Sequence, residues 1–299
     1  MKLYVLPVEK ACNASCQWCI TDFRETAKKG LLAVADLEEK LAELPTLDKI
    51  EITGGGEPLL HPQIDRIVRT CVLKAPTMIY TNGALLERKA PHLRGVYQIA
   101  ISRAHYDNHE NARIMDVDYD WETAVRACPA SVKASLLLHK GGIETAEGVR
   151  HYLDWLHESG VRKAVIRQLF THESQQYAVR FDDARVGTAD IYRTLGGRDA
   201  PQGMQNPHLG WNGLDVEFEL RTCACETDNP VLHADGRLHK GWTQGILLVD
   251  TDRQRNRPLG ALGGGSKIVV RVTCDTVRRV ESARCRETNG RTLIIRSSQ

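Results

Sequence analysis

Cys12-Asn13-Ala14-Ser15-Cys16-Gln17-Trp18-Cys19 places three thiols in one short loop, directly after an apolar run at residues 3–8 that predicts a strand. Three thiolates at the carboxyl end of a strand can each bind one iron of a cubane cluster. Such clusters usually have four protein ligands, so a set of three leaves one iron open to an exogenous ligand. The alternative, a structural zinc site, needs four closed ligands, and the next cysteine is only Cys71. The spacing therefore favours a metal site with an open coordination position.

The bulk composition is that of an ordinary globular protein. Of 299 residues, 42% are hydrophobic and 26% charged, and 40 Lys and Arg against 38 Asp and Glu leave a net charge of +2. This balance argues against the broad basic face of nucleic-acid-binding proteins. The N-terminal apolar run is too short for a signal peptide, and no stretch approaches the ~20 apolar residues of a membrane span. Nine cysteines without an export signal predict a reducing compartment, by default the cytoplasm.

Strand and helix patterns alternate along the first two thirds of the chain. Amphipathic helices are expected at residues 35–44, 64–72 and 145–159. Strands are expected at residues 3–8, 49–53, 77–81, 96–102, 133–139 and 165–169. Six strands alternating with helices imply right-handed parallel βαβ units. The fold class predicted is therefore α/β, with the strands curled into a partial (β/α)6 barrel.

The pattern changes after about residue 171. Residues 202–214 are rich in Gly, Pro, Asn and Gln and predict a loop or boundary. Only short strands follow, at 216–220, 231–233, 246–249, 268–272 and 293–295, with a hairpin turn at 234–237. We therefore expect a core at residues 1–205 and a small β-rich C-terminal extension at residues 206–299, which would bind or cap the substrate.

The cysteine spacing resembles the hallmark of the radical S-adenosylmethionine (SAM) superfamily: three cysteines separated by three and then two residues, with an aromatic residue, here Trp18, before the last. Gly55-Gly56-Glu57-Pro58, after the second strand, resembles the family motif that binds the methionyl amino group of SAM. Glycines let backbone carbonyls approach the ammonium, and Glu57 adds a complementary charge. The extra glycine Gly54 leaves the register of these contacts open by one residue.

The resemblance continues at later strand ends. Thr81-Asn82-Gly83 resembles the family's third motif, and Ser102 stands where many members contact the SAM ribose or carboxylate. Arg103 and Arg167 are candidates for the SAM carboxylate, because a guanidinium pairs with a carboxylate in bidentate geometry. Each arginine is equally a candidate for a plain salt bridge. An apolar wall for the adenine, or simply core, is expected from Leu137, Ile166 and Leu169.

The resemblance implies that Cys12, Cys16 and Cys19 hold three irons of a 4Fe–4S cluster whose fourth iron binds SAM. In the family, the reduced cluster cleaves SAM to methionine and a 5′-deoxyadenosyl radical, which abstracts a hydrogen from the substrate. This chemistry implies an oxygen-sensitive enzyme and a reductant such as flavodoxin or ferredoxin. The substrate expected is a small molecule of natural-product, nucleoside, sugar or amino-acid type.

Arg221-Thr222-Cys223-Ala224-Cys225 suggests an alternative, because it resembles the region after the barrel in some peptide-modifying members. Cys223 or Cys225 could return a hydrogen atom to a substrate radical, as in an epimerase. With Cys274 and Cys285 they could also ligate an auxiliary cluster, and ordinary buried thiols are the third interpretation. A peptide-modifying maturase or epimerase is therefore the second function. The barrel is expected to begin at residue 3, without a preceding peptide-recognition domain, which favours the small-molecule function.

Overall fold

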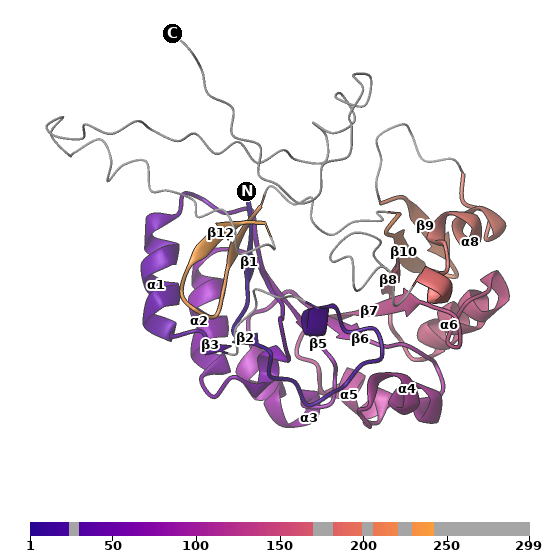
Figure 1. The fold of residues 1–299 in the computed structure, drawn as a ribbon, viewed down its shortest axis with the longest axis horizontal. Helices are drawn as coiled ribbons and strands as arrows, with labels where there is room; N and C mark the ends of the chain where they lie inside the picture. Colours follow the sequence, from indigo (N-terminus) through magenta and orange to yellow (C-terminus); the bar gives the residue numbers. More distant parts are fainter. Residues whose placement is uncertain (24–29, 170–181, 199–205, 221–228, 242–299) are drawn as a thin grey trace, which may run out of the picture. The chain divides into compact units, whose positions relative to one another are not determined.

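One sheet of ten strands organises the part of the chain that the structure, a computed structural model, describes: residues 1–23, 30–169, 182–198, 206–220 and 229–241. The strand order is β12-β11-β1-β4-β5-β6-β7-β8-β10-β9 (Figure 1). The eight strands from β11 to β10 in this order run parallel, and an antiparallel strand closes each edge. The strands are β1 (Lys2–Val5), β4 (Lys49–Ile52), β5 (Thr77–Thr81), β6 (Gln98–Ser102), β7 (Ser131–Leu138), β8 (Lys163–Gln168), β9 (His208–Trp211), β10 (Leu214–Phe218), β11 (Pro230–Leu232) and β12 (Leu238–Lys240).

Helices follow most of these strands and lie along one side of the sheet (Figure 1). The α-helices are α1 (Val34–Glu43), α2 (Ile64–Lys74), α3 (Leu86–Lys89), α4 (Asn108–Met115), α5 (Trp121–Ala127), α6 (Ala146–Glu158) and α8 (Thr188–Thr194). The 3-10 helices are η1 (Ile20–Phe23), η2 (Pro58–Leu60), η3 (Ala90–Leu93) and η4 (Asp182–Ala184). Two short strands, β2 (Val8–Glu9) and β3 (Gly30–Leu31), form a separate antiparallel pair. Among the described residues, no helix combines the length and apolarity needed to cross a membrane.

The core lies between the sheet and these helices, because side chains alternate along each strand. In β4, Ile50 and Ile52 are fully buried in the main apolar cluster. Lys49 and Glu51 point to the other face of the sheet, where they line a cavity. Helices complete the core with one apolar face each, as α6 does with Val149, Tyr152, Leu153 and Leu156. The face of the sheet away from the helices is therefore free to carry polar side chains.

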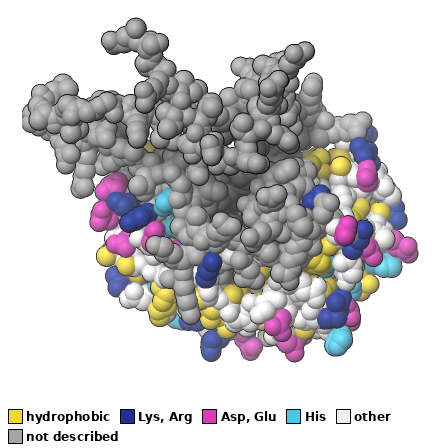
Figure 2. All heavy atoms as spheres, in the orientation of Figure 1, with side chains coloured by type: hydrophobic (Ala, Val, Ile, Leu, Met, Phe, Trp, Pro, Cys, Tyr) yellow, Lys and Arg dark blue, Asp and Glu magenta, His cyan; other side chains and the backbone are white. Residues whose placement is uncertain are grey.

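Charges of both signs are mixed on the described surface. Figure 2 shows acidic, basic and hydrophobic side chains interspersed over the described part of the face it draws. The net charge of the whole chain, +2, agrees with this mixture. Large hydrophobic side chains are exposed singly, as Leu73 is on α2, which is normal for a globular surface.

The predicted fold class is confirmed: a parallel α/β sheet of the partial-barrel type. The six predicted strands correspond to β1, β4, β5, β6, β7 and β8 in this order. The predicted loop at 202–214 is wrong for residues 208–211, which form β9. Asn212-Gly213 explains the difference, since both residues have positive φ (46° and 86°) and turn the chain from β9 into β10. Asn-Gly is a favoured hairpin dipeptide.

Strands after residue 205 continue the same sheet. β10 pairs in parallel with β8, and β11 pairs in parallel with β1, so the sheet runs on across the expected boundary between residues 205 and 206. The hairpin turn expected at 234–237 joins β11 to β12. The strands expected at 246–249, 268–272 and 293–295 lie outside the described residues. A substrate-binding or capping role for residues 206–299 stays a prediction.

We expect Leu153→Ala to lower the free energy of unfolding by about 2–5 kcal/mol, because Leu153 is fully buried and its truncation leaves a cavity. Leu73→Ala is the matched control. Its side chain is 82% exposed, so the change should stay within about 0.5 kcal/mol. Urea unfolding of both variants measures the difference. Equal losses would show that α6 does not pack on the sheet as described.

Candidate functional site

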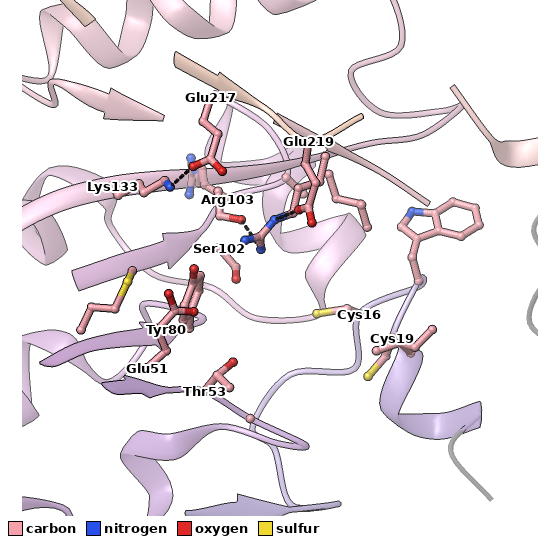
Figure 3. Close-up of a pocket in the computed structure, with 18 of the residues that line it drawn as sticks. Cys16, Cys19, Glu51, Thr53, Tyr80, Ser102, Arg103, Lys133, Glu217 and Glu219 are labelled. Carbon is pink, nitrogen blue, oxygen red and sulfur yellow. Dashed lines mark hydrogen bonds and ion pairs between the residues drawn. The ribbon is translucent and has the colours of Figure 1, made fainter. Parts of the chain in front are cut away.

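A cavity of about 530 Å³ lies on the face of the sheet away from the helices (Figure 3). Its walls come from the cysteine loop at one end and from β1, β4, β5, β6, β7, β8 and β10. Small-molecule sites usually measure about 300–1,000 Å³. The cavity therefore has the size of a site for a cofactor, a small substrate, or both.

The cysteine loop closes one end of this cavity. Cys12, Cys16 and Cys19 are free thiols, and Cys16 and Cys19 line the cavity. Two backbone hydrogen bonds tie the loop to the end of α4: Ser15 N donates to Met115 O (3.2 Å) and Gln17 N to Ile114 O (3.1 Å). The fold thus brings two of the three predicted ligands, Cys16 and Cys19, to the cavity wall, and Cys12 lies in the same loop.

The thiols fit a cluster better than a single ion. Across the described ranges, no three His, Cys, Asp or Glu side chains are close enough to bind one metal ion. In a cubane, each thiolate binds a different iron, so its ligands need not converge on one point. Three accessible thiols beside a cavity therefore suit a 4Fe–4S cluster with one iron open toward the cavity.

Asn82 connects the third motif to the cysteine loop. Its Nδ2 donates to Asn13 Oδ1 at 2.8 Å and lies 3.7 Å from Cys12 Sγ. Burial raises the pKa of the Cys12 thiol, while hydrogen bonds from the Ala14 backbone and from Asn82 oppose the shift. Asn82 thus lies where its N–H can donate to a thiolate.

The glycine segment 54–56 packs directly against the chain that leads into Cys12. Lys10 N donates to Gly55 O (2.7 Å), and Glu57 N donates to Ala11 O (3.0 Å). A Cβ on Gly56 would lie 2.2 Å from Ala11 O, so no side chain fits there. Of this segment, Gly54 lines the cavity. The residue before the predicted motif is therefore the glycine that faces the site.

Glu57 is buried at the junction of two strand ends. Its side chain accepts hydrogen bonds from Leu59 N (3.0 Å), Thr81 Oγ1 (2.8 Å) and Asn82 N (2.8 Å). Burial raises its pKa, and the three hydrogen bonds oppose that shift. Like Gly55, Gly56, Pro58 and Asn82, Glu57 is not part of the cavity wall. Its geometry is that of a carboxylate that holds the loops together.

The two candidate arginines have different surroundings. Arg103 is only 1% exposed, and its guanidinium donates to Asn108 Oδ1 (2.6 Å). It also lies 5.3 to 5.6 Å from the ring centroids of Tyr119, Trp121 and Trp155. This packing is typical of a structural arginine held by aromatic rings. The geometry favours the plain structural interpretation for Arg103.

Arg167 lies on the cavity wall. Its Nε forms an ion pair with Glu219 (2.8 Å), and Nη1 donates to Ser135 Oγ at 3.2 Å. Burial disfavours its charge, but Glu219 more than offsets this and the pKa of Arg167 is raised. Ser102 also lines the cavity. The predicted SAM-carboxylate partners Ser102, Arg103 and Arg167 thus all line the cavity, but the guanidinium of Arg103 is enclosed by aromatic rings.

An apolar patch adjoins the cysteines. Trp18 lines the cavity with its ring centroid 5.0 Å from that of His139. Leu137 and Leu169 line the cavity and pack in one cluster with Trp18. Ile166, the third residue expected there, is buried in the core on the helix side. The side-chain alternation of β8 explains this difference, because Ile166 and Arg167 point to opposite faces.

The sequence analysis missed the ion pairs in the deeper part of the cavity. Glu51 pairs with Lys49 (2.6 Å) and Lys2 (3.4 Å). Lys133 pairs with Glu217 at 2.6 Å (Figure 3). Burial disfavours the charge of Glu217, but Lys133 outweighs it and lowers the pKa. The signal available in the sequence was the alternation of charged and apolar residues in Lys-Ile-Glu-Ile (49–52) and Asp-Val-Glu-Phe (215–218).

Cys223 and Cys225 lie outside the described residues, as do Cys274 and Cys285. Their proposed roles as hydrogen donors or auxiliary-cluster ligands therefore stay predictions. Cys71 and Cys128 are far from this chemistry: burial raises the pKa of each thiol to about 12. Thiols of such high pKa remain protonated near neutral pH.

Comparisons with known proteins agree with this geometry. The GTP 3′,8-cyclase of Chlorobaculum tepidum is 37% identical over 91 residues, which cover 28% of this chain and 26% of that protein. The match thus spans about a quarter of the curated relative's length. SuiB of Streptococcus suis, solved with S-adenosylmethionine bound, has the same fold with a TM-score of 0.57 and 16% identity, over 79% of this chain and 59% of that chain. Residues 7–165, more than half of the chain, match the family model of the radical SAM superfamily. The protein therefore belongs to the radical SAM superfamily, whose members use a 4Fe–4S cluster and S-adenosylmethionine.

Proposed function

We propose that this protein is an enzyme that cleaves SAM reductively at a 4Fe–4S cluster and abstracts a hydrogen from a small polar substrate. The observation that carries this proposal is the placement of three free thiols beside a cavity of about 530 Å³. Bound there, the cluster and SAM supply a 5′-deoxyadenosyl radical. The protein's part is to hold both groups, to place the substrate hydrogen and to exclude water.

Each residue's part in this proposal follows from its position. Cys12, Cys16 and Cys19 would ligate three irons, leaving the fourth open toward the cavity. The backbone of Gly54, on the cavity wall, suits the SAM ammonium. A SAM carboxylate would pair with Arg167 on β8 and accept from Ser102 on β6, since both residues line the cavity. The apolar patch of Trp18, Leu137 and Leu169 suits the adenine ring.

Gly55, Gly56, Glu57, Pro58 and Asn82 would support this site from behind. They fix the glycine segment and the cysteine loop by the hydrogen bonds described above. Pro58 begins η2, at a position where its lack of a backbone N–H leaves no donor unpaired. Supporting residues of this kind orient the groups that touch a cofactor. The motif residues thus act mainly through position.

The charges of the deep cavity favour a substrate with both a cationic and an anionic group. One wall carries Glu51 with two lysines, and the opposite wall carries Lys133 with Glu217 and Arg167 with Glu219 (Figure 3). The ammonium and carboxylate of an amino-acid-type molecule can each find an opposite charge there. An uncharged apolar molecule would exclude water from these charged groups and offer them no opposite charge in its place, which is costly.

A nucleoside triphosphate suits this cavity poorly. Its phosphates would have to draw Lys2, Lys49, Lys133 and Arg167 away from the carboxylates with which they are paired. Glu51, Glu217 and Glu219 would then be left in the cavity without their cations, which is costly. The GTP 3′,8-cyclase match covers only 28% of this chain, so it does not define the substrate end of the site. We therefore place the substrate in the amino-acid class rather than the nucleotide class.

The remaining parts of the proposal concern the rest of the chain and its partners. Residues 206–299 would bind or cover the substrate next to the core at residues 1–205. Radical SAM chemistry needs an electron donor, and flavodoxin or ferredoxin would deliver it. A reduced cytoplasm is the compartment that preserves such a cluster and free thiols.

We expect the anaerobically reconstituted protein to form 5′-deoxyadenosine when dithionite and SAM are added. Cys12→Ala should lose this activity by roughly two orders of magnitude or more, because ligand loss removes the cluster. Cys128→Ala is the matched control, since Cys128 donates to Ala124 O (3.2 Å) on α5, packs against the main apolar cluster and does not line the cavity. Chromatographic measurement of 5′-deoxyadenosine decides the outcome. Equal, trace levels from all three proteins would overturn the proposed function.

Iron content separates one cluster from two, and so tests the auxiliary-cluster form of the alternative function. We expect about four irons per chain, one cubane. About eight irons, with a loss of the second set in Cys223→Ala or Cys225→Ala, would instead favour the peptide-modifying alternative. An iron assay on the same reconstituted samples gives the answer.

We expect at least one of the free L-amino acids to raise 5′-deoxyadenosine formation above the rate with SAM alone, and GTP to leave that rate unchanged. Lys133→Met should abolish the stimulation but keep the basal rate, because it unpairs Glu217 deep in the cavity, away from the cysteines. The measurement is the same product assay over a panel of these compounds. Stimulation by GTP alone would contradict the amino-acid class while leaving SAM cleavage intact.

A further inference from the structure

Three neighbouring strands end side by side next to the cysteine loop. β1 lies between β11 and β4 in the sheet, and all three run parallel. Beyond its last residue, β11 continues to Ala234, β1 to Glu9 and β4 to Gly55. Glu9 therefore lies in the middle, three residues before Cys12, with the glycine segment on one side and the hairpin β11–β12 on the other.

On one side, Glu9 contacts the glycine segment through its backbone and its stem. Glu9 and Gly55 form a parallel β-bridge, and Lys10 N donates to Gly55 O at 2.7 Å. A Cβ on Gly55 would lie 3.0 Å from Glu9 Cγ. Residues 9–11 and 54–57 therefore form one closely packed backbone unit, and a shift of Glu9 would move Gly55 with it.

On the other side, the carboxylate of Glu9 is held by the hairpin. His233 Nδ1 lies 3.0 Å from Oε1, and Ala234 N donates to Oε2 at 3.0 Å. Both side chains are 2% exposed, so water does not replace these contacts. The hairpin itself is fixed to β1 by parallel pairing, which Leu6 N extends by donating to Leu232 O (2.9 Å). Glu9 thus spans from the hairpin to the glycine segment.

We propose that Glu9 and His233 are positioning residues for SAM: they hold the glycine segment in the position from which its backbone binds the methionyl ammonium. This inference rests on the proposed function. The hairpin β11–β12 would then belong to the cofactor site through Glu9, although it carries none of the motif residues. Loss of the His233 contact would leave Oε1 of Glu9 without this partner and only Ala234 N of the two hairpin contacts in place. This would loosen the Glu9–Gly55 pair and weaken SAM binding while the three thiols stay in place.

The experiment compares reconstituted wild type, His233→Ala, His233→Asn and His239→Ala. His239 is the matched control, because its ring lies against that of His233 (centroids 4.7 Å apart) and is equally part of the hairpin. The side-chain amide of asparagine can place an N–H near the position of His Nδ1. Measured are the iron content, the melting temperature, and the SAM dissociation constant from the change that SAM causes in the electron paramagnetic resonance spectrum of the reduced cluster.

We expect His233→Ala to bind SAM about 10-fold more weakly at full iron content, in the range known for residues that orient ligands from behind. His233→Asn should recover most of the affinity, and His239→Ala should bind as wild type does, even where its melting temperature falls as much. Equal affinity for His233→Ala and wild type would overturn the inference, and so would an equal loss in His239→Ala. A wild type that binds no SAM would overturn the proposed function itself.

A second variant keeps the test decisive should His233→Ala take up no iron. Glu9→Asp retains the charge but withdraws the carboxylate by one methylene from His233 Nδ1 and Ala234 N. It should show the same roughly 10-fold loss of SAM affinity with full iron content. Wild-type affinity in Glu9→Asp would overturn the inference on its own.

Discussion

The buried carboxylate of Glu57 is the interaction on which the geometry of the site depends. Burying a carboxylate costs several kcal/mol unless hydrogen bonds replace its water. Glu57 recovers this cost from Leu59 N, Thr81 Oγ1 and Asn82 N, which belong to its own turn and to the end of β5. Its backbone N–H bonds to Ala11 O at the entrance to the cysteine loop. The ends of three strands are thereby fixed at one residue, and with them the cysteines and the glycine segment.

A second constraint is the two-residue period of the strands. Helices cover only one face of the sheet, so only every second strand residue must be apolar, as Ile50 and Ile52 are in β4. The intervening residues, Lys49 and Glu51 among them, are free to carry charge into the cavity. Parallel strands buried on both faces usually read as continuous apolar runs. The alternation here is thus itself evidence that one face of this parallel sheet lines a site.

Sequence reasoning predicted the strands well because they depend on local patterns, and the placement of Cys16 and Cys19 on the cavity wall is consistent with the predicted cluster ligands. The cysteine spacing and the order of six strand patterns need no knowledge of tertiary contacts. It could not foresee contacts between residues that are far apart in the chain: Glu57 is held by Thr81 and Asn82, and Arg103 is enclosed by aromatic rings from α5 and α6. The SAM-binding roles expected for both residues stay predictions. The strand β9 was missed although the Asn212-Gly213 dipeptide announces its hairpin. Residues 221–228 lie outside the described part of the chain, so the roles of Cys223 and Cys225 remain predictions from the sequence.

The carboxylates around the site divide into two groups by their partners. Glu57 and Glu9 are held by backbone N–H groups, a hydroxyl and a histidine, and both are turned away from the cavity. Glu51, Glu217 and Glu219 line the cavity and are paired with lysine or arginine. A charged substrate can exchange partners with the second group, because each new ion pair replaces an old one. The first group offers no such exchange, since the groups that donate hydrogen bonds to Glu57 and Glu9 do not face the cavity. The chain thus keeps the carboxylates that position its loops chemically separate from those that can respond to a ligand, so substrate entry need not disturb the cysteine loop.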